Sequence, residues 1–141
     1  MCSSDLTQLP LETAKEIAKT QYWDALRLDE VALIAPRIAE ELFDTAYNCG
    51  VDTAGRFLQE SLNALNRQGR DYPDVVIDGR LGPATIASLR IYMMMRRKSA
   101  GEDVLLKALN ALQGAYYIEI ARTRPENETF LFGWLSKRVE L

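Results

Sequence analysis

The chain contains no histidine and only two cysteines, Cys2 and Cys49. Ser-His-Asp and Cys-His catalysis both need an imidazole base, so both mechanisms are excluded. Two cysteines without histidine cannot supply the four ligands of a structural zinc site, and we expect no disulfide framework. Cys49 ends an apolar helical stripe, where a reduced thiol packed in the interior is the simplest interpretation. Any catalysis would therefore rest on carboxylates, and the sequence predicts neither a metal nor another cofactor.

Long apolar runs and a strong net charge are also missing. No stretch approaches the roughly 20 apolar residues that a membrane span needs, and the first residues lack the basic start and apolar stretch of a secretory signal. The formal net charge is −3, so no global field favours nucleic acid or anionic wall polymers. The basic run Arg96-Arg97-Lys98 lacks a nucleic-acid recognition motif, and we expect a solvated helix end there.

Helical periodicity covers most of the chain. Pro10, Pro36 and Pro83 each stand where a first helical turn would begin, and Gly50 follows the second of these helices. Asp52 is placed to cap the next helix. Hydrophobic residues make up 48% of the composition and charged residues 26%, which is typical of a globular domain.

The second half of the chain continues the helical pattern. After a turn at residues 99–102, a helix over residues 103–122 is apolar on nearly all sides, as expected of the central helix of a bundle. The β-branched run at residues 75–77 allows one short extended piece but no sheet. The sequence therefore predicts an all-α fold.

The most informative local pattern is Asp78-Gly79-Arg80-Leu81-Gly82-Pro83-Ala84-Thr85. Asp-Gly favours a tight turn, Gly82 permits a backbone angle that other residues resist, and Pro83 presets the first turn of a helix. The N–H groups at such a helix start can hold an anion or a sugar acetamido carbonyl. We therefore take Asp78, Gly79, Gly82 and Thr85 as candidate ligand contacts, and the alternative is a structural turn that orients two helices.

Two further places could contact a sugar. Tyr22 and Trp23 are adjacent aromatics that can stack on sugar rings, and the alternative is a core anchor for the segment that follows. Asp44 and Asn48 are four residues apart and share a helix face, which could line a polysaccharide cleft or face solvent. Glycosidases use two carboxyl groups that flank the scissile bond. The sequence singles out none of its many carboxylates, so it names no catalytic residue.

Several short segments follow the order found in one family of bacterial and phage enzymes. They are residues 11–17, Tyr22-Trp23-Asp24, residues 42–50, residues 57–59, Asp78-Gly79 with residues 82–85, residues 108–114 and Phe132-Gly133-Trp134. On these segments, residues 6–139 resemble the later part of glycoside hydrolase family 108, N-acetylmuramidases that carry a predicted peptidoglycan domain. The resemblance implies a lysozyme-like helical bundle. It also implies that the full-length enzyme hydrolyses the β-1,4 bond between N-acetylmuramic acid and N-acetylglucosamine.

The chain departs from this family at its front. The family's Glu-Gly-Gly motif, whose Glu the resemblance implies to be the general acid, does not occur in the sequence. We therefore expect the chain to lack the N-terminal catalytic segment. Because Cys2-Ser3-Ser4-Asp5-Leu6 is what a common sequencing-adapter tail spells when translated, we take residues 1–6 as a non-native extension and residues 7–141 as one helical domain.

The sequence thus predicts the peptidoglycan-binding portion of a muramidase, without lytic activity of its own. We expect peptidoglycan as the partner, a monomeric chain, and no contact with nucleic acid. We also expect synthesis in the cytoplasm with action at the cell wall or periplasm, by an export route that stays open. The alternatives are a stand-alone wall-binding module without catalytic history, and a helical interaction domain such as a secretion accessory, which would have no affinity for peptidoglycan.

Overall fold

The computed structural model describes residues 16–17 and 19–139, and every regular element in those ranges is helical. In chain order the elements are the π-helical turn η2 (Lys19–Asp24), α2 (Leu28–Ile34), α3 (Pro36–Cys49), α4 (Val51–Ala64), the 3₁₀ turn η3 (Arg67–Gly69), α5 (Pro83–Met95), α6 (Lys98–Thr123), the 3₁₀ turn η4 (Pro125–Asn127) and α7 (Glu128–Arg138). The described ranges contain no strand, which confirms the predicted all-α fold. The start of the helix expected from Pro10 and the non-native extension expected at residues 1–6 lie outside the described residues.

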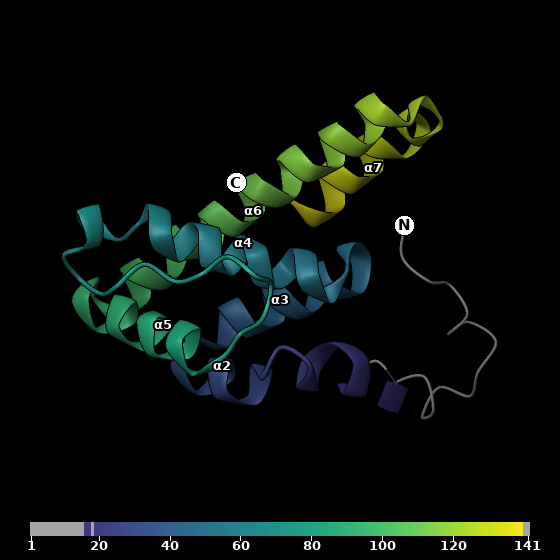
Figure 1. Ribbon diagram of the computed structural model, residues 1–141. Helices are drawn as coiled ribbons and strands as arrows, with labels where there is room; N and C mark the ends of the chain where they lie inside the picture. Colours follow the sequence, from purple (N-terminus) through teal and green to yellow (C-terminus); the bar gives the residue numbers. More distant parts are fainter. Residues whose placement is uncertain (1–15, 18, 140–141) are drawn as a thin grey trace.

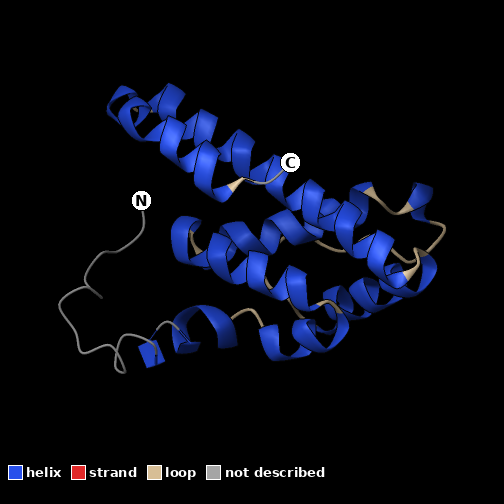
Figure 2. Ribbon diagram, turned by 180° about the vertical axis from the view of Figure 1, so that it is seen from behind, coloured by secondary structure: helices blue, strands red, loops and turns tan. Residues whose placement is uncertain are grey.

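The helices form a body with one projecting hairpin. In the body, α3 packs against α2, α4 and α6, and α5 packs against the same three helices. The part of α6 up to Tyr117 contacts this body, whereas its last turns leave the body beside α7 (Figure 1). Figure 2 shows the same projecting pair from behind. The protein therefore presents two kinds of surface: the body, and a hairpin that is held mainly by its own two helices.

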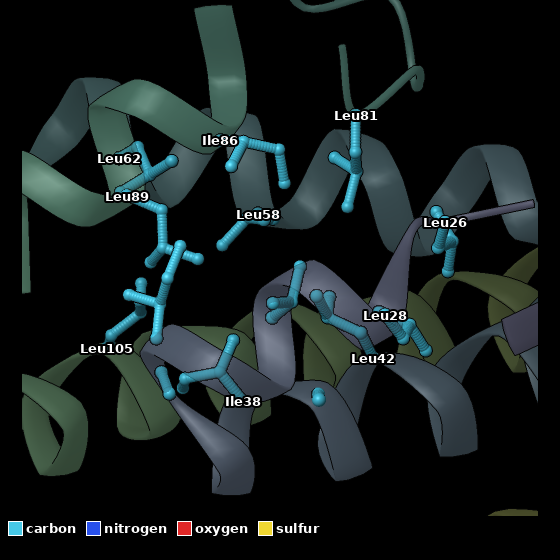
Figure 3. Close-up of a cluster of buried hydrophobic side chains, with 14 of the residues drawn as sticks. Leu26, Leu28, Ile38, Leu42, Leu58, Leu62, Leu81, Ile86, Leu89 and Leu105 are labelled. Carbon is cyan, nitrogen blue, oxygen red and sulfur yellow. The ribbon is translucent and has the colours of Figure 1, made fainter. Parts of the chain in front are cut away.

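The core explains why five helices make a single body. Leucine and isoleucine side chains from all five point toward one another, and each of the following is at most 1% exposed: Leu28, Ile38, Leu42, Leu58, Leu62, Leu89 and Leu105 (Figure 3). Full burial of one such side chain contributes roughly 1.5–3 kcal/mol. Removing any one helix would therefore expose several of these side chains at once.

The prolines expected to begin helices do so, since Pro36 and Pro83 occupy the first turns of α3 and α5. The start of α3 is also capped from α6. The backbone N–H of Arg37 donates to Oε2 of Glu102 at 3.0 Å, and Nε of Arg37 donates to Oε1 at 3.1 Å. A carboxylate at this position complements the positive end of the helix dipole. The contact ties α6 to α3 across the body.

Three local expectations are wrong. The N-cap of α4 is Gly50 rather than Asp52, whose carboxylate instead pairs with Arg56 at 2.8 Å. Residues 99–102 are not a turn, because α6 already begins at Lys98. The long helix is not buried on all sides either: Val104 is 47% exposed and Ile118 is 46% exposed. Beyond Tyr117, which still contacts Cys49 of α3, the described partners of α6 are η4 and α7, so an apolar helix here does not mean a central one.

Candidate functional site

Three tyrosines line a hollow of about 210 Å³ at the end of α3, which we call the tyrosine hollow. Tyr22 comes from η2, Tyr47 from the last turn of α3 and Tyr116 from the middle of α6. The other lining residues are Ala46, Asn48, Cys49 and Gly50. The lining therefore offers aromatic rings and one side-chain amide, with no carboxyl group among the residues that the structure describes.

Gly50 creates the geometry at the base of the tyrosine hollow. Its φ of 102° lies in the region that favours glycine, and its N–H donates to the carbonyl of Ala46 at 2.9 Å to end α3. The next helix, α4, begins at Val51. The two helices therefore meet without a loop, and Tyr47 and Asn48 in the last turn of α3 line the hollow together with Tyr22 of η2 and Tyr116 of α6.

The structure brings together two of the residues that the sequence proposed for sugar contact, Tyr22 and Asn48. The ring of Tyr22 lies 5.5 Å from that of Tyr47, centroid to centroid, and 6.4 Å from that of Phe43. Asn48 Nδ2 donates to the backbone carbonyl of Asp44 at 2.9 Å and to Oδ1 of Asp44 at 3.2 Å. These contacts fix the orientation of both side chains that line the hollow.

Asp44 and Trp23 do not line the tyrosine hollow. Asp44 is exposed and lies one helical turn away, where its carboxylate orients Asn48. Trp23 packs its ring 5.8 Å from that of Phe43 and donates from Nε1 to Oδ1 of Asp29 at 2.8 Å. These contacts agree with the alternative of a core anchor, and direct sugar contact by either residue stays a prediction.

Sequence reasoning missed Tyr47 and Tyr116 as lining residues. They are far apart in the chain, and only the fold brings them together. The ring of Tyr116 lies 6.1 Å from those of Phe57 and Tyr117, in edge-to-face contacts that hold it in place. The available signal was the adjacent pair Tyr116-Tyr117 in a helix that has no other aromatic residue. Cys49 was expected in the interior, but it is only half-buried and lines the hollow, with Sγ 3.7 Å from Oη of Tyr117.

The segment that leads to the Asp78-Gly79 turn is bound by side-chain amides of α4 and of Asn66, which follows that helix. Asn66 pairs with both backbone groups of Tyr72, and Asn63 does the same with Val75, donating to its carbonyl at 2.9 Å and accepting from its N–H at 2.8 Å. Each amide thus supplies the donor and the acceptor that a neighbouring strand would supply. Together with Gln59 these residues form what we call the amide ladder. The extended run 75–77 is held in this way without a sheet.

Gln59 makes the most hydrogen bonds in the amide ladder, and its side chain is 1% exposed. Its Oε1 accepts from the backbone N–H groups of Asp78 at 3.0 Å and Gly79 at 2.8 Å. Its Nε2 donates to Oδ1 of Asp78 at 3.0 Å, to the carbonyl of Arg80 at 2.8 Å and to Oγ1 of Thr85 at 3.2 Å. One buried side chain therefore holds both the turn and the start of α5.

The position of the turn against Gln59 and α4 explains the roles of the residues in the Asp-Gly motif. Gly79 has the positive φ expected of it, 80°, and a Cβ there would lie 2.2 Å from Oδ1 of Asp52. Gly82 differs from expectation: its φ of −80° and ψ of −176° are ordinary extended values that any residue adopts. Thr85 is buried with its hydroxyl against Gln59. Hydrogen bonds from the backbone N–H of Arg80 and from Gln59 hold the pKa of Asp78 below its usual value.

The structure thus separates the predicted sites into two groups. Asp78, Gly79, Gly82 and Thr85 lie where the loop meets α4 and α5, and none of them lines the tyrosine hollow. Two of the groups that could have bound a ligand, the Gly79 N–H and the Thr85 hydroxyl, are engaged by Gln59. The geometry agrees with the alternative of a structural turn, and ligand contact by these four residues stays a prediction.

Over the described residues, no three Cys, Asp or Glu side chains gather closely enough to hold a metal ion. Nor does any helix in that part of the chain combine the length and the hydropathy required to cross a bilayer.

Comparisons with known proteins identify two families that the chain matches. Residues 53–139 match the family described as Predicted Peptidoglycan domain, and residues 1–50 match Glycosyl hydrolase 108. A comparison with curated proteins gave no match. Tyr116 lies in the first of these matched stretches and the other lining residues of the tyrosine hollow lie in the second, so the hollow forms where the two meet. The chain therefore belongs to the predicted peptidoglycan domain family, carries a glycosyl hydrolase 108 segment ahead of that domain, and fits a peptidoglycan-binding portion of a muramidase that acts at the cell wall.

Proposed function

We propose that this chain binds the glycan strand of peptidoglycan in the tyrosine hollow. The observation that carries the proposal is the convergence of three tyrosine rings and one oriented amide from η2, α3 and α6. Binding sites for small ligands combine an aromatic or apolar lining with a few placed polar groups. The tyrosine hollow has this composition, and residues from both matched stretches build it.

The chemistry of the lining suits an N-acetylated sugar. Tyrosine rings offer an apolar face to the C–H groups of a pyranose, and the ring hydroxyl remains a polar group at the edge. The hydroxyls of Tyr22 and Tyr47 have no hydrogen-bond partner among the described residues. Asp44 engages Nδ2 of Asn48, which leaves Oδ1 of Asn48 to accept from the N–H of an acetamido group.

Binding without cleavage is the function that this lining supports. Glycoside hydrolysis uses a carboxylic acid to protonate the leaving oxygen and a second carboxyl group across the scissile bond. The lining of the tyrosine hollow contains neither among the described residues, and the nearby carboxylate of Asp44 is exposed and bonded to Asn48. We therefore expect the purified 141-residue chain not to clear a suspension of cell walls. Clearing that Asp44→Ala abolishes would contradict this.

Co-sedimentation with purified, insoluble peptidoglycan tests the proposal. Tyr47→Ala removes a lining ring, and we expect it to weaken binding about tenfold, which corresponds to about 1.4 kcal/mol. Phe132→Ala is the matched aromatic control, because Phe132 lies on α7 with 83% of its surface exposed and does not line the tyrosine hollow. If both variants lose binding equally, the chain adheres through general surface hydrophobicity, and the tyrosine hollow is rejected as the binding site.

A second pair of variants tests the amide on the same helix. Asn48→Ala removes a lining residue, whereas Asp44→Ala removes only one of the two acceptors that orient it and keeps the backbone carbonyl of residue 44. We expect the loss of affinity to be larger for Asn48→Ala than for Asp44→Ala. The reverse order would show that the exposed carboxylate, and not the hollow, contacts the glycan. Absence of wild-type binding would favour the alternative of a secretion-accessory domain.

A further inference from the structure

A second hollow, of about 310 Å³, lies at the tip of the projecting hairpin, away from the tyrosine hollow. Its lining consists of Arg124, Glu126, Asn127, Phe130 and Trp134, and we call it the η4 hollow. The turn η4 reverses the chain between α6 and α7 and supplies Glu126 and Asn127, while the first two turns of α7 supply the rings. None of these five residues belongs to the buried hydrophobic cluster of the body.

The aromatic part of the η4 hollow is packed against the protein on one side and exposed on the other. The rings of Phe130 and Trp134 are stacked, with centroids 6.0 Å apart and planes 25° apart. Trp134 is 7% exposed and is itself held by Tyr117, whose ring centroid lies 5.1 Å away. Phe130 is 56% exposed. A buried indole thus supports a phenyl ring whose outer surface is left to solvent, at the cost of hydrating apolar area.

The polar part of the η4 hollow is not used by the fold. The side chains of Arg124, Glu126 and Asn127 make no hydrogen bond or ion pair with any described residue. The three together carry one positive charge, one negative charge and one neutral amide. Such a set has no net charge with which to select an ionic ligand. It offers donors and acceptors of both kinds, which suits a neutral ligand rich in hydroxyl and acetamido groups.

We propose that the η4 hollow is a second glycan subsite, in which a pyranose ring of peptidoglycan stacks on Phe130 and bonds to Arg124, Glu126 and Asn127. The inference rests on the proposed function, since it extends the binding of the same polymer to a second place. A line of ring contacts connects the two hollows. It runs from Tyr116 to Tyr117, Trp134 and Phe130 with centroid steps of 6.1, 5.1 and 6.0 Å. These linking rings are buried, since Tyr117 is 1% and Trp134 7% exposed, so they join the two hollows through the interior. A glycan strand long enough to reach both hollows would gain affinity through effective concentration.

The same helix offers a matched control for Phe130. Phe132 lies two residues further along α7, is 83% exposed and does not line the η4 hollow. If binding at the hairpin were general adhesion to apolar surface, Phe132→Ala would weaken it at least as much as Phe130→Ala, because Phe132 exposes the larger share of its ring. A specific subsite predicts the opposite order.

The intrinsic emission of Trp134 reports directly on the η4 hollow. The chain contains two tryptophans, so Trp23→Phe leaves Trp134 as the only one. We would titrate the full-length Trp23→Phe chain with the N-acetylglucosamine tetramer and follow that emission. We expect a saturable change, an apparent Kd about tenfold weaker after Phe130→Ala, and a change of less than twofold after Phe132→Ala. Arg124→Gln leaves the ring stack intact, and we expect it to weaken binding about threefold. This second variant tests the subsite even if Phe130→Ala fails to fold.

The outcomes separate this inference from the proposed function. If the wild-type chain co-sediments with peptidoglycan but the tetramer leaves Trp134 emission unchanged, the η4 subsite is rejected while the tyrosine hollow survives. If Phe132→Ala weakens binding of the tetramer as much as Phe130→Ala does, the subsite is also rejected. Sedimentation velocity adds one more test: a dimer that Phe130→Ala dissolves would make the η4 hollow an interface between copies of the chain and overturn the glycan assignment.

Discussion

Replacing Gln59 by leucine should detach the loop that carries the Asp-Gly turn. Leucine keeps most of the volume of glutamine, so the change removes the amide without opening a large cavity. The five hydrogen bonds of Gln59 are lost together. The N–H of Gly79 is then left without its partner in a buried position, whereas Asp78 and Arg80 are exposed and can bind water.

The magnitude follows from these environments. A buried donor without a partner costs about 1–3 kcal/mol, and each hydrogen bond exchanged for water costs about 0.5–1.5 kcal/mol. Burial of the new leucine offsets part of this loss. We expect a net decrease of about 3 kcal/mol in the free energy of unfolding, a large fraction of the roughly 5–15 kcal/mol typical of a domain.

Urea denaturation followed by circular dichroism measures the effect. We expect the midpoint for Gln59→Leu to fall by more than about 1 M urea at an unchanged slope. Glu60→Ala is the control, because Glu60 is the next residue of α4, is exposed and has no bonding partner among the described side chains; it should stay within about 0.5 kcal/mol of wild type. Hydrogen exchange at the Gly79 amide should also accelerate in Gln59→Leu. A midpoint as high as that of the control would refute the role of the amide ladder.

Two further predictions concern stability. Gly55→Ala should destabilise the protein by more than about 2 kcal/mol despite the better helix propensity of alanine, because its Cβ would lie 2.1 Å from the carbonyl oxygen of Gly79. Gly114→Ala, whose Cβ would lie 3.6 Å from Val139, should instead stabilise α6 by about 0.5–1 kcal/mol, and urea midpoints that move the same way in both variants would contradict the packing. Burial raises the pKa of Tyr72 to about 12, above the value of about 10 for an unfolded tyrosine, so the stability it contributes is complete below pH 10 and is lost as the pH rises towards 12. Tyr72→Phe should lessen that alkaline loss, as measured by unfolding at pH 8 and pH 11, and an unchanged loss would exclude Tyr72 as its source.

Element boundaries set by local chemistry could be predicted from the sequence. Pro36, Pro83 and Gly50 mark helix ends because each restricts or permits particular backbone angles regardless of the rest of the fold. The start of α6 could not be predicted in this way. Residues 99–102 include Gly101, and their local pattern predicts a turn, yet Glu102 lies within the helix and reaches Arg37 of α3. A tertiary contact overrides local propensity there.

The candidate site was only partly predictable. Tyr22 and Asn48 have recognisable sugar-binding chemistry, but Tyr47 and Tyr116 become lining residues only when α3 and α6 pack together. The amide ladder did leave a readable signal. Gln59 and Asn63 are spaced four residues apart, which places two amides on one face of α4 beside buried leucines, and Asn66 follows just after the helix ends. Amide side chains at positions spaced for the core need hydrogen-bond partners when buried, so they predict that a segment of backbone packs against them.

The most direct test of glycan binding in the tyrosine hollow is a ¹H–¹⁵N correlation titration of the full chain with glycan strands stripped of their stem peptides. We expect the backbone signals of Tyr47, Asn48, Gly50 and Tyr116, which line the tyrosine hollow, to shift in a saturable manner, while those around the exposed Leu33 and Met94 do not. Saturable shifts that avoid the tyrosine hollow, or no shift at concentrations where the chain co-sediments with peptidoglycan, would contradict it.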